Sequence, residues 1–440
     1  MSNNKLDHLK IGLRSQDIQT SIQDVDLGPL NVETKNIRLI GMAERLAIHI
    51  RGADVIDDYK KLEYIASQFG IDSLILPNVL GILEELEWAR VEKEGSRIKK
   101  VEENVPYFSD IYSIAGEYFE NTGHSEIEDA TIAVCDSLAM SPSTEEEIRK
   151  KIGLDDTAYN MILDIGKSGK IIGQYVSSET KEKVLYSPLY WVENPDKLET
   201  VYKLLKRFGA DQVYNALKRI KDYQGLPLAS DILKGDYNAL SEDMKIISEA
   251  IRKGVILAPE VNSLKGNKNF AFTPYVGIPI EEKITLEKAM CILSCIRYGE
   301  HFGTITKIRF PELVLDTLLS PPHRTKTPHS EVRRQYALLV GRGIGRIFPD
   351  RNLKDRYYFE LIPTEENKKA VQLAKDLLKV GEAINSKGVS PDLQKVLFYP
   401  GSYKEAIRTL PKLKKPAHIS IKTQEQVLNN IMDALRGGSV

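Results

Sequence analysis

One passage that recurs four times along this 440-residue chain constrains its fold more than any other feature. Each copy contains the end of a helix-like stretch near a glycine or tryptophan, then a strand, a polar turn and a second strand. The helix ends fall about 80 to 90 residues apart, and such a near-constant period is typical of an array of similar units. The four copies occupy residues 79–103, 161–191, 246–276 and 336–363, with helix ends near Trp88, Gly169, Gly254 and Gly343.

The intervals between these copies leave room for two further short helices, so one full unit consists of three helices and a hairpin. This order resembles the winged helix, a helix-turn-helix variant with an appended β-hairpin. The resemblance covers residues 36–363 and holds at superfamily level. It implies a mainly α chain with small β-hairpins, of the α+β class, built as an array of three to four winged-helix domains. The arrangement is similar to multi-winged-helix DNA-binding and complex-assembly proteins of bacteria and archaea.

The same reading divides the chain into six ranges. Residues 1–35 alternate polar and apolar residues without a sustained period, which predicts an extended N-terminal arm. The first and second winged-helix units are expected at 36–104 and 125–192. A helical segment with a third, winged-helix-like unit follows at 195–278, then a basic fourth unit at 284–363, then C-terminal helices and a lysine-rich tail at 364–440.

Charge and cysteine content limit the classes of function. The formal net charge is -1, so a uniformly basic surface is excluded and any phosphate contact requires a local patch. The three cysteines, Cys135, Cys291 and Cys295, give no disulfide framework, and the polar N-terminus lacks a secretory core. Both observations predict a cytoplasmic protein. No stretch is apolar for long enough to cross a bilayer, so no membrane partner is expected.

The first unit carries an acidic third helix. Pro77 suits its first turn, and the apolar residues after it predict a buried stripe of Val79, Leu80, Leu83 and Leu86. The exposed side is expected to carry Glu84, Glu85 and Glu87. In a helix-turn-helix this helix enters the major groove, where carboxylates would repel phosphates. We therefore expect a protein contact or a structural role for this unit.

The second and third units are marked by capping residues and buried stripes. Ser143 and Glu146 are predicted to form a capping box, and Ser241 to cap the third helix of the third unit. The core side of the second unit's third helix is expected to carry Tyr159, Ile162 and Ile165. Between these units, residues 196–224 contain Lys203, Lys206, Arg207, Lys218, Arg219 and Lys221. This pattern favours a solvated helical face, with a basic binding face as the alternative.

The fourth unit differs from the others in charge. Between Pro321 and Arg356 nine Lys or Arg residues stand against three acids, and two histidines, His323 and His329, add to them. Ser330 is predicted to cap the third helix, whose apolar stripe consists of Val332, Tyr336, Leu339 and Val340. The side chains of Arg333, Arg334 and Gln335 are then expected to point away from the core.

Arginine and glutamine near a helix N-terminus are residue types that reach guanine and adenine edges, and basic wing residues hold phosphates. The predicted nucleic-acid contacts of the fourth unit are Arg324, Lys326, Arg333, Arg334, Gln335, Arg342, Arg346, Arg351, Lys354 and Arg356. The tail adds Lys412, Lys414 and Lys415. Two alternatives stay open: the arginines pair with acidic faces of the first and third units, in this chain or in another copy, and the tail lysines form an ordinary soluble surface.

No strong catalytic pattern is present in the sequence. There is no P-loop, and the glycines at 341–346 are expected to end a helix instead of binding a dinucleotide. Cys291 and Cys295 are expected in the core, and we predict neither a metal nor a cofactor. Asp164, Glu179 and Lys181 loosely resemble the carboxylate, carboxylate and lysine set of metal-dependent nucleases, which is kept as an alternative.

The sequence thus predicts a non-enzymatic protein that binds nucleic acid, duplex DNA above all, mainly through the fourth unit. The alternative is a scaffold or adaptor in a larger cytosolic complex for repair, segregation or defence. Such a protein would act through protein contacts, including self-association into a homo-oligomer, and the alternation of acidic and basic units favours it. No small-molecule substrate is predicted.

Overall fold

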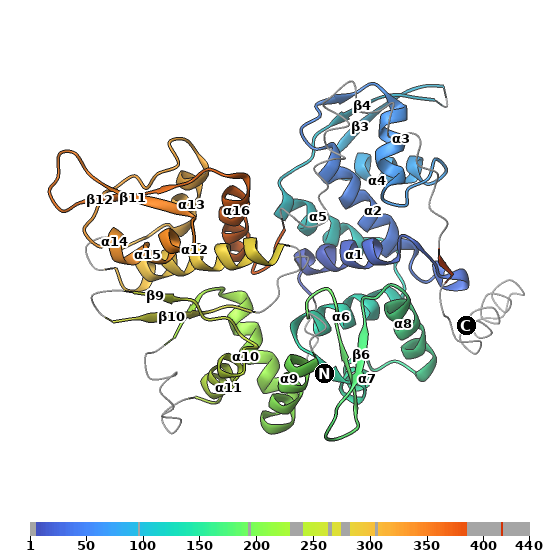
Figure 1. Cartoon of the computed structure of the whole chain (residues 1–440). Helices are drawn as coiled ribbons and strands as arrows, with labels where there is room; N and C mark the ends of the chain where they lie inside the picture. The colour runs from blue at the N-terminus through green and yellow to red at the C-terminus, as the bar shows by residue number, and fades with distance from the viewer. Residues whose placement is uncertain are drawn as a thin grey trace, which may run out of the picture.

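The computed structural model describes residues 6–95, 97–191, 195–228, 241–262, 266–273, 282–303, 307–384 and 415–416. These residues form a mainly helical structure with small antiparallel sheets, and one short parallel pair joins β1 (Val25–Asp26) to β13 (Lys415–Pro416). Figure 1 shows α1 (His8–Ile22) in the middle of the molecule, between the first unit above it and the second unit below it. The third unit lies beneath the fourth on the left side of the view.

The first two units share one order of elements, and the described residues of the third follow it apart from the middle helix. The first contains α2 (Lys35–Ile50), β2 (Val55–Ile56), α3 (Tyr59–Ser67), α4 (Leu76–Glu85), β3 (Ala89–Glu94) and β4 (Arg97–Glu103). The second contains α6 (Glu126–Met140), β5 (Ser143–Thr144), α7 (Glu145–Ile152), α8 (Asp156–Ser168), β6 (Gly173–Val176) and β7 (Lys183–Tyr186). In the third, α9 (Pro195–Phe208) precedes α10 (Ala210–Asp222), β8 (Leu226–Pro227), α11 (Glu242–Arg252), β9 (Glu260–Val261) and β10 (Lys268–Ala271).

These three units also share one sheet order. The last strand of each unit lies in the centre, so the orders are β2-β4-β3, β5-β7-β6 and β8-β10-β9. The short strand that follows the first helix is thereby joined to the C-terminal hairpin, which closes the helices of each unit over a common core. The predicted middle helix of the third unit falls largely on residues 229–240, which lie outside the described part of the chain.

The fourth unit completes its sheet in a different way. It contains α12 (Lys283–His301), α13 (Pro311–Leu319), α14 (Val332–Gln335), α15 (Ala337–Gly341), β11 (Gly345–Pro349) and β12 (Tyr357–Leu361). β11 and β12 form an antiparallel hairpin. The other edge of β12 is bound by the segment between α13 and α14, where the amides of Thr325 and His329 donate to the carbonyls of Phe359 and Tyr357 at 2.9 and 3.1 Å. In the fourth unit the segment that pairs with the central strand therefore follows the second helix, whereas in the first three units it follows the first.

The third helix of the fourth unit is broken, whereas one continuous helix was predicted. It consists of α14 and α15, separated at Tyr336, whose backbone has φ -103° and ψ 9°. Ser330 is not the cap, because Glu331 holds that position and makes no capping hydrogen bond. Val332, Tyr336 and Leu339 are buried as predicted, but Val340 is exposed. The break changes the helical phase, so the stripe does not continue to Val340.

The prediction of an extended arm over residues 1–35 was wrong for the residues that the structure describes there. Residues 6–34 contain α1, β1 and the short 3₁₀ helix η1 (Gly28–Asn31), and α1 packs against α2 and α5 (Phe108–Asn121). Two glycines permit the close approach of α1 and α5. A Cβ at Gly116 would lie 1.9 Å from the His8 carbonyl oxygen, and one at Gly12 would lie 2.2 Å from that of Tyr112. Any larger residue would force these helices apart.

A buried ion cluster joins α1 to three other parts of the molecule. The fully buried guanidinium of Arg14 contacts Asp17 at 2.8 Å, Asp136 of α6 at 3.1 Å and Glu382, which follows α16 (Glu365–Lys379), at 2.5 Å. Tyr190 accepts a hydrogen bond from Arg14, and Lys221 of α10 pairs with Glu382. Buried charges are tolerated only when they are paired in this way. The cluster therefore links α1 to the second unit, the third unit and the segment after α16.

Two predicted caps differ in detail from the structure. The capping box of α7 is formed by Thr144 and Glu147, one residue later than predicted, because Ser143 is paired with Leu185 in the sheet. Ser241 precedes α11 as predicted, but its side chain makes no capping hydrogen bond. Most of the predicted buried stripes are confirmed. They include Val79, Leu80, Leu83, Tyr159, Ile162, Ile165, Cys291 and Cys295, while Leu86 is half-buried.

Candidate nucleic-acid interface

Two arginines of the fourth unit lie on aromatic rings of the hairpin. The guanidinium of Arg324 is 4.5 Å from the centre of the Tyr358 ring and 5.5 Å from that of Phe348. Arg333 lies 5.2 Å from the ring of Tyr357. Successive residues of a strand point to opposite faces, so these contacts flank both faces of β12. Arginine held over a ring keeps its donors available, and cation–π stacking fixes its direction.

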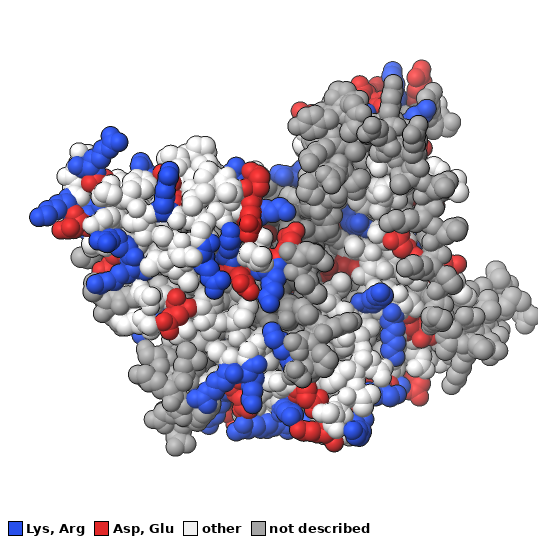
Figure 2. Space-filling view, in the orientation of Figure 1, with Lys and Arg blue, Asp and Glu red and all other residues white. Residues whose placement is uncertain are grey.

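The turn of the hairpin presents further basic residues. The carboxylate of Asp350 accepts hydrogen bonds from the amides of Asn352 and Leu353, both at 2.8 Å. These bonds, with one from Tyr358, hold the pKa of Asp350 below its usual value. The charged carboxylate thus fixes the turn that carries Arg351 and Lys354. Both side chains are exposed, and Figure 2 shows Lys and Arg side chains, interspersed with acids, at the end of the molecule where Figure 1 places β11 and β12.

Two of the predicted contacts are paired inside the unit. Arg346 lies opposite Glu360 in the hairpin register, and its Nε donates to the Glu360 carboxylate at 2.9 Å. Arg342 lies 3.8 Å from Glu287 of α12. The seven others have no ion-pair partner among the described residues, namely Arg324, Lys326, Arg333, Arg334, Arg351, Lys354 and Arg356. In the described part of the chain, none of the nine pairs with the first or third unit of the same molecule, so the within-chain form of that alternative is not observed.

Gln335 was expected to face solvent, and the structure contradicts this. Its side chain is buried, and its Nε2 donates to the carbonyl of Cys295 in α12 at 2.8 Å. The helix break at Tyr336 turns this position toward the core, so Gln335 positions α14 on α12 and is not free to contact a base. The predicted residues Lys412 and Lys414 lie outside the described residues, and Lys415 is described only as part of β13.

The basic residues of α9 and α10 do not form a free patch. Their partners lie on the second unit's hairpin turn, on α10 and on α11: Lys203 pairs with Glu179, Lys206 with Glu182, Arg207 with Glu249, Lys218 with Asp222 and Arg219 with Asp243. The sixth residue, Lys221, is buried in the ion cluster. The turn of the second unit is therefore held against α9, as the hydrogen bond from the Tyr175 hydroxyl to the Leu198 carbonyl at 2.9 Å also shows.

The carboxylates of the nuclease alternative are not gathered at a metal site. Glu179 lies 2.6 Å from Lys203. Across the described residues, no group of three or more His, Cys, Asp or Glu side chains is arranged to hold a metal ion. In the first unit, Glu84, Glu85 and Glu87 are exposed as predicted, and Glu85 accepts a hydrogen bond from Tyr118 at 2.5 Å.

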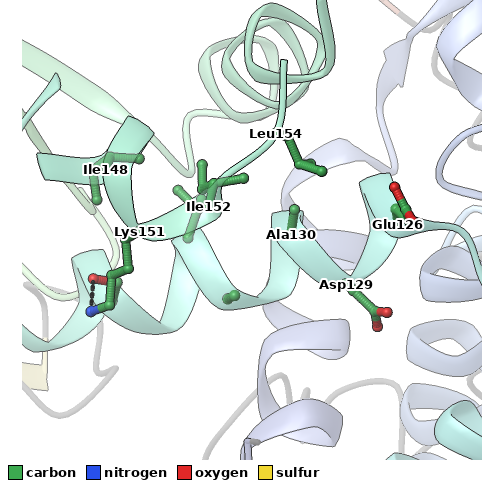
Figure 3. Close-up of a pocket in the computed structure, with 10 residues that line it drawn as sticks. Glu126, Asp129, Ala130, Ile148, Lys151, Ile152 and Leu154 are labelled. Carbon is green, nitrogen blue, oxygen red and sulfur yellow. Dashed lines mark hydrogen bonds between the residues drawn. The ribbon is translucent and has the colours of Figure 1, made fainter. Parts of the chain in front are cut away.

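The second unit contains an apolar hollow of about 340 Å³ between α6 and α7. Figure 3 shows Ile148, Ile152 and Leu154 along it, with the carboxylates of Glu126 and Asp129 at one end. At the other end Lys151 donates to the hydroxyl of Ser137 at 3.0 Å, and burial lowers the pKa of this lysine. A mostly apolar surface with opposite charges at its ends suits an apolar polypeptide segment better than a reaction. Sequence patterns did not indicate this hollow.

No protein-family model, curated protein or solved structure matches this chain. Among the helices that the structure describes, none has the length and apolar character needed to cross a bilayer.

Proposed function

We propose that the chain is an array of winged-helix domains that binds duplex DNA through its fourth unit. The array is supported by the first three units, in which a short strand after the first helix pairs with the last strand of a C-terminal hairpin. This is the arrangement expected of a winged helix. The fourth unit departs from this arrangement in two ways. Its third helix is broken, and the segment that pairs with the edge of β12 follows the second helix instead of the first.

The distribution of ion pairs carries the DNA-binding proposal. The basic residues of α9 and α10 are neutralised by nearby acids, whereas seven in the fourth unit have no carboxylate partner among the described residues. Charges without a partner are the ones that release counterions when they meet phosphates. Arg333 and Arg334 on α14 are exposed, and they are the best placed to reach base edges in a groove.

A salt-varied binding titration tests this function. Duplex DNA, single-stranded DNA and RNA are each titrated with the full chain at several salt concentrations, with and without a divalent metal so that cleavage is also detected. We expect the log of the duplex affinity to fall linearly with log salt, at about 0.9 per phosphate contacted. Affinity that is absent for all three nucleic acids at low salt would refute the proposal.

The scaffold alternative is favoured by one observation of its own, the apolar hollow between α6 and α7. Its acidic end, with Glu126 and Asp129, would suit a partner segment that is basic at one end and apolar along its length. Light scattering and pull-downs from the native host distinguish the two functions. A monomer that binds DNA and recovers no protein would contradict the scaffold.

A further inference from the structure

A second cavity lies in the fourth unit, on the side of α13. Its volume is about 400 Å³, which is within the range of small-molecule sites. The apolar wall consists of Ile308, Leu313, Val314 and Tyr336. The opposite wall belongs to the segment 325–329, the same segment that binds the edge of β12. The hairpin thus holds one wall of the cavity in place.

The charges around this cavity are all positive. Lys307 and Lys326 lie at its rim, both are exposed, and neither has an ion-pair partner within the described ranges. Among the residues that the structure describes, the lining contains no Asp or Glu. An adjoining hollow of about 420 Å³ shares Thr317 and Lys326 and adds Arg324, while its one acid, Asp316, pairs with Lys375 at 2.7 Å. Such a set of charges attracts an anion.

His329 supplies a polar group inside the cavity. The residue is only 8% exposed, and its buried Nδ1 has no hydrogen-bond partner among the described residues. Burial, with the charge of Arg356 adding to it, lowers its pKa to about 4, so the imidazole is neutral at pH 7. A neutral imidazole both donates and accepts hydrogen bonds.

We propose that this cavity binds an organic phosphate of mononucleotide size. The phosphate lies between the ammonium groups of Lys307 and Lys326, and the ring system packs on the apolar wall of Ile308, Leu313 and Val314. The buried imidazole of His329 lies beside this wall as part of the lining. The site goes beyond DNA binding: it shares Lys326 with the proposed DNA contacts, whereas Arg333, Arg334 and the turn residues are not in its lining.

Calorimetric titration of the full chain with AMP, GMP, CMP and UMP tests the site, with adenosine, ribose 5-phosphate and inorganic phosphate as partial ligands. We expect at least one nucleotide to bind at one site per chain, and the partial ligands to bind about tenfold more weakly or worse, since each loses a set of contacts. A 5′-phosphorylated single strand distinguishes a free nucleotide from a strand end. No binding of any of the four nucleotides at millimolar concentration would overturn the proposal.

Two variants and one control locate the site. Lys307→Ala is expected to weaken nucleotide binding about tenfold, the loss of one charge-assisted contact. Thr317→Phe places a ring in the cavity and is expected to abolish binding without removing a charge. Lys93→Ala, on the hairpin of the first unit and outside the cavity lining, is the matched control and is expected to bind as the wild type does. Circular dichroism verifies the fold of each variant. Equal losses in the control, or wild-type binding by both variants, would refute the assignment.

Discussion

Neutralising the hairpin turn should change the salt dependence of DNA binding by a defined amount. Seven basic residues of the fourth unit have no ion-pair partner among the described residues, so the slope of log affinity against log salt has an upper bound of about -6. Arg351 and Lys354 are two of the seven, and Asp350 holds their turn in place. The double variant Arg351→Ala, Lys354→Ala should reduce the magnitude of the slope by about 2, or about 1 per lost phosphate contact.

The consequence for affinity is large enough to measure. Between 50 and 200 mM salt a slope of about -6 corresponds to a loss of nearly four orders of magnitude, and a slope of about -4 to two or three. Fluorescence anisotropy with a labelled duplex gives both slopes. The control is Lys203→Ala, Lys206→Ala, which removes the same charge from α9, where both lysines are paired with acids. An unchanged slope in the turn variant, or an equal change in the control, would refute the reasoning.

Three further predictions concern stability. Gly116→Ala should lower the free energy of unfolding by about 1–3 kcal/mol, because its Cβ would meet the His8 carbonyl. Gly81→Ala, with open space around it in α4, is the control and should stabilise the protein by up to about 1 kcal/mol. Urea denaturation measures both changes. Arg14→Ala removes a buried guanidinium that contacts three carboxylates and should cost about 3–5 kcal/mol, against about 0–1 for Arg149→Ala at the surface, measured in the same way. Burial lowers the pKa of His49 to about 4, below its unfolded value of about 6.5. The stability that this neutral imidazole contributes is therefore fully present above about pH 6.5 and is lost as the pH falls toward 4. Urea denaturation at pH 7 and at pH 4.5 measures how much the free energy of unfolding falls between the two. This fall should be about 2–3 kcal/mol smaller for His49→Gln than for the wild type, and an equal fall would contradict the prediction.

The regular parts of the fold could be predicted from the sequence, because each depends on neighbouring residues. Amphipathic stripes gave α4 and α8, and the polar turns gave the hairpins that follow them. The same approach failed for α1, where Arg14 and Gln19 are buried among partners, so that polar residues interrupt the apolar stripe of the helix. A search for apolar residues at helical spacing misses a helix whose buried face is partly polar.

The candidate site was predictable in composition but not in pairing. The excess of basic residues in the fourth unit was visible, yet the pairing of Arg346 with Glu360 depends on the hairpin register. The burial of Gln335 depends on a break at Tyr336 that no local pattern indicates. Contacts such as that of Arg14 with Glu382, which are distant in sequence, follow only from the arrangement of whole units. The charge pattern of the sequence therefore identified the basic residues of the fourth unit, but not which of them are paired with acids.

The central claim, that α14 of the fourth unit contacts duplex DNA, is tested most directly by one comparison. The affinity of the wild type for a duplex is measured beside that of the folded double variant Arg333→Ala, Arg334→Ala, at the same salt concentration and by the same gel-shift titration. The account predicts that the variant binds at least about tenfold more weakly, from about 1–3 kcal/mol for each base-directed contact. Equal affinity of the two proteins would contradict it.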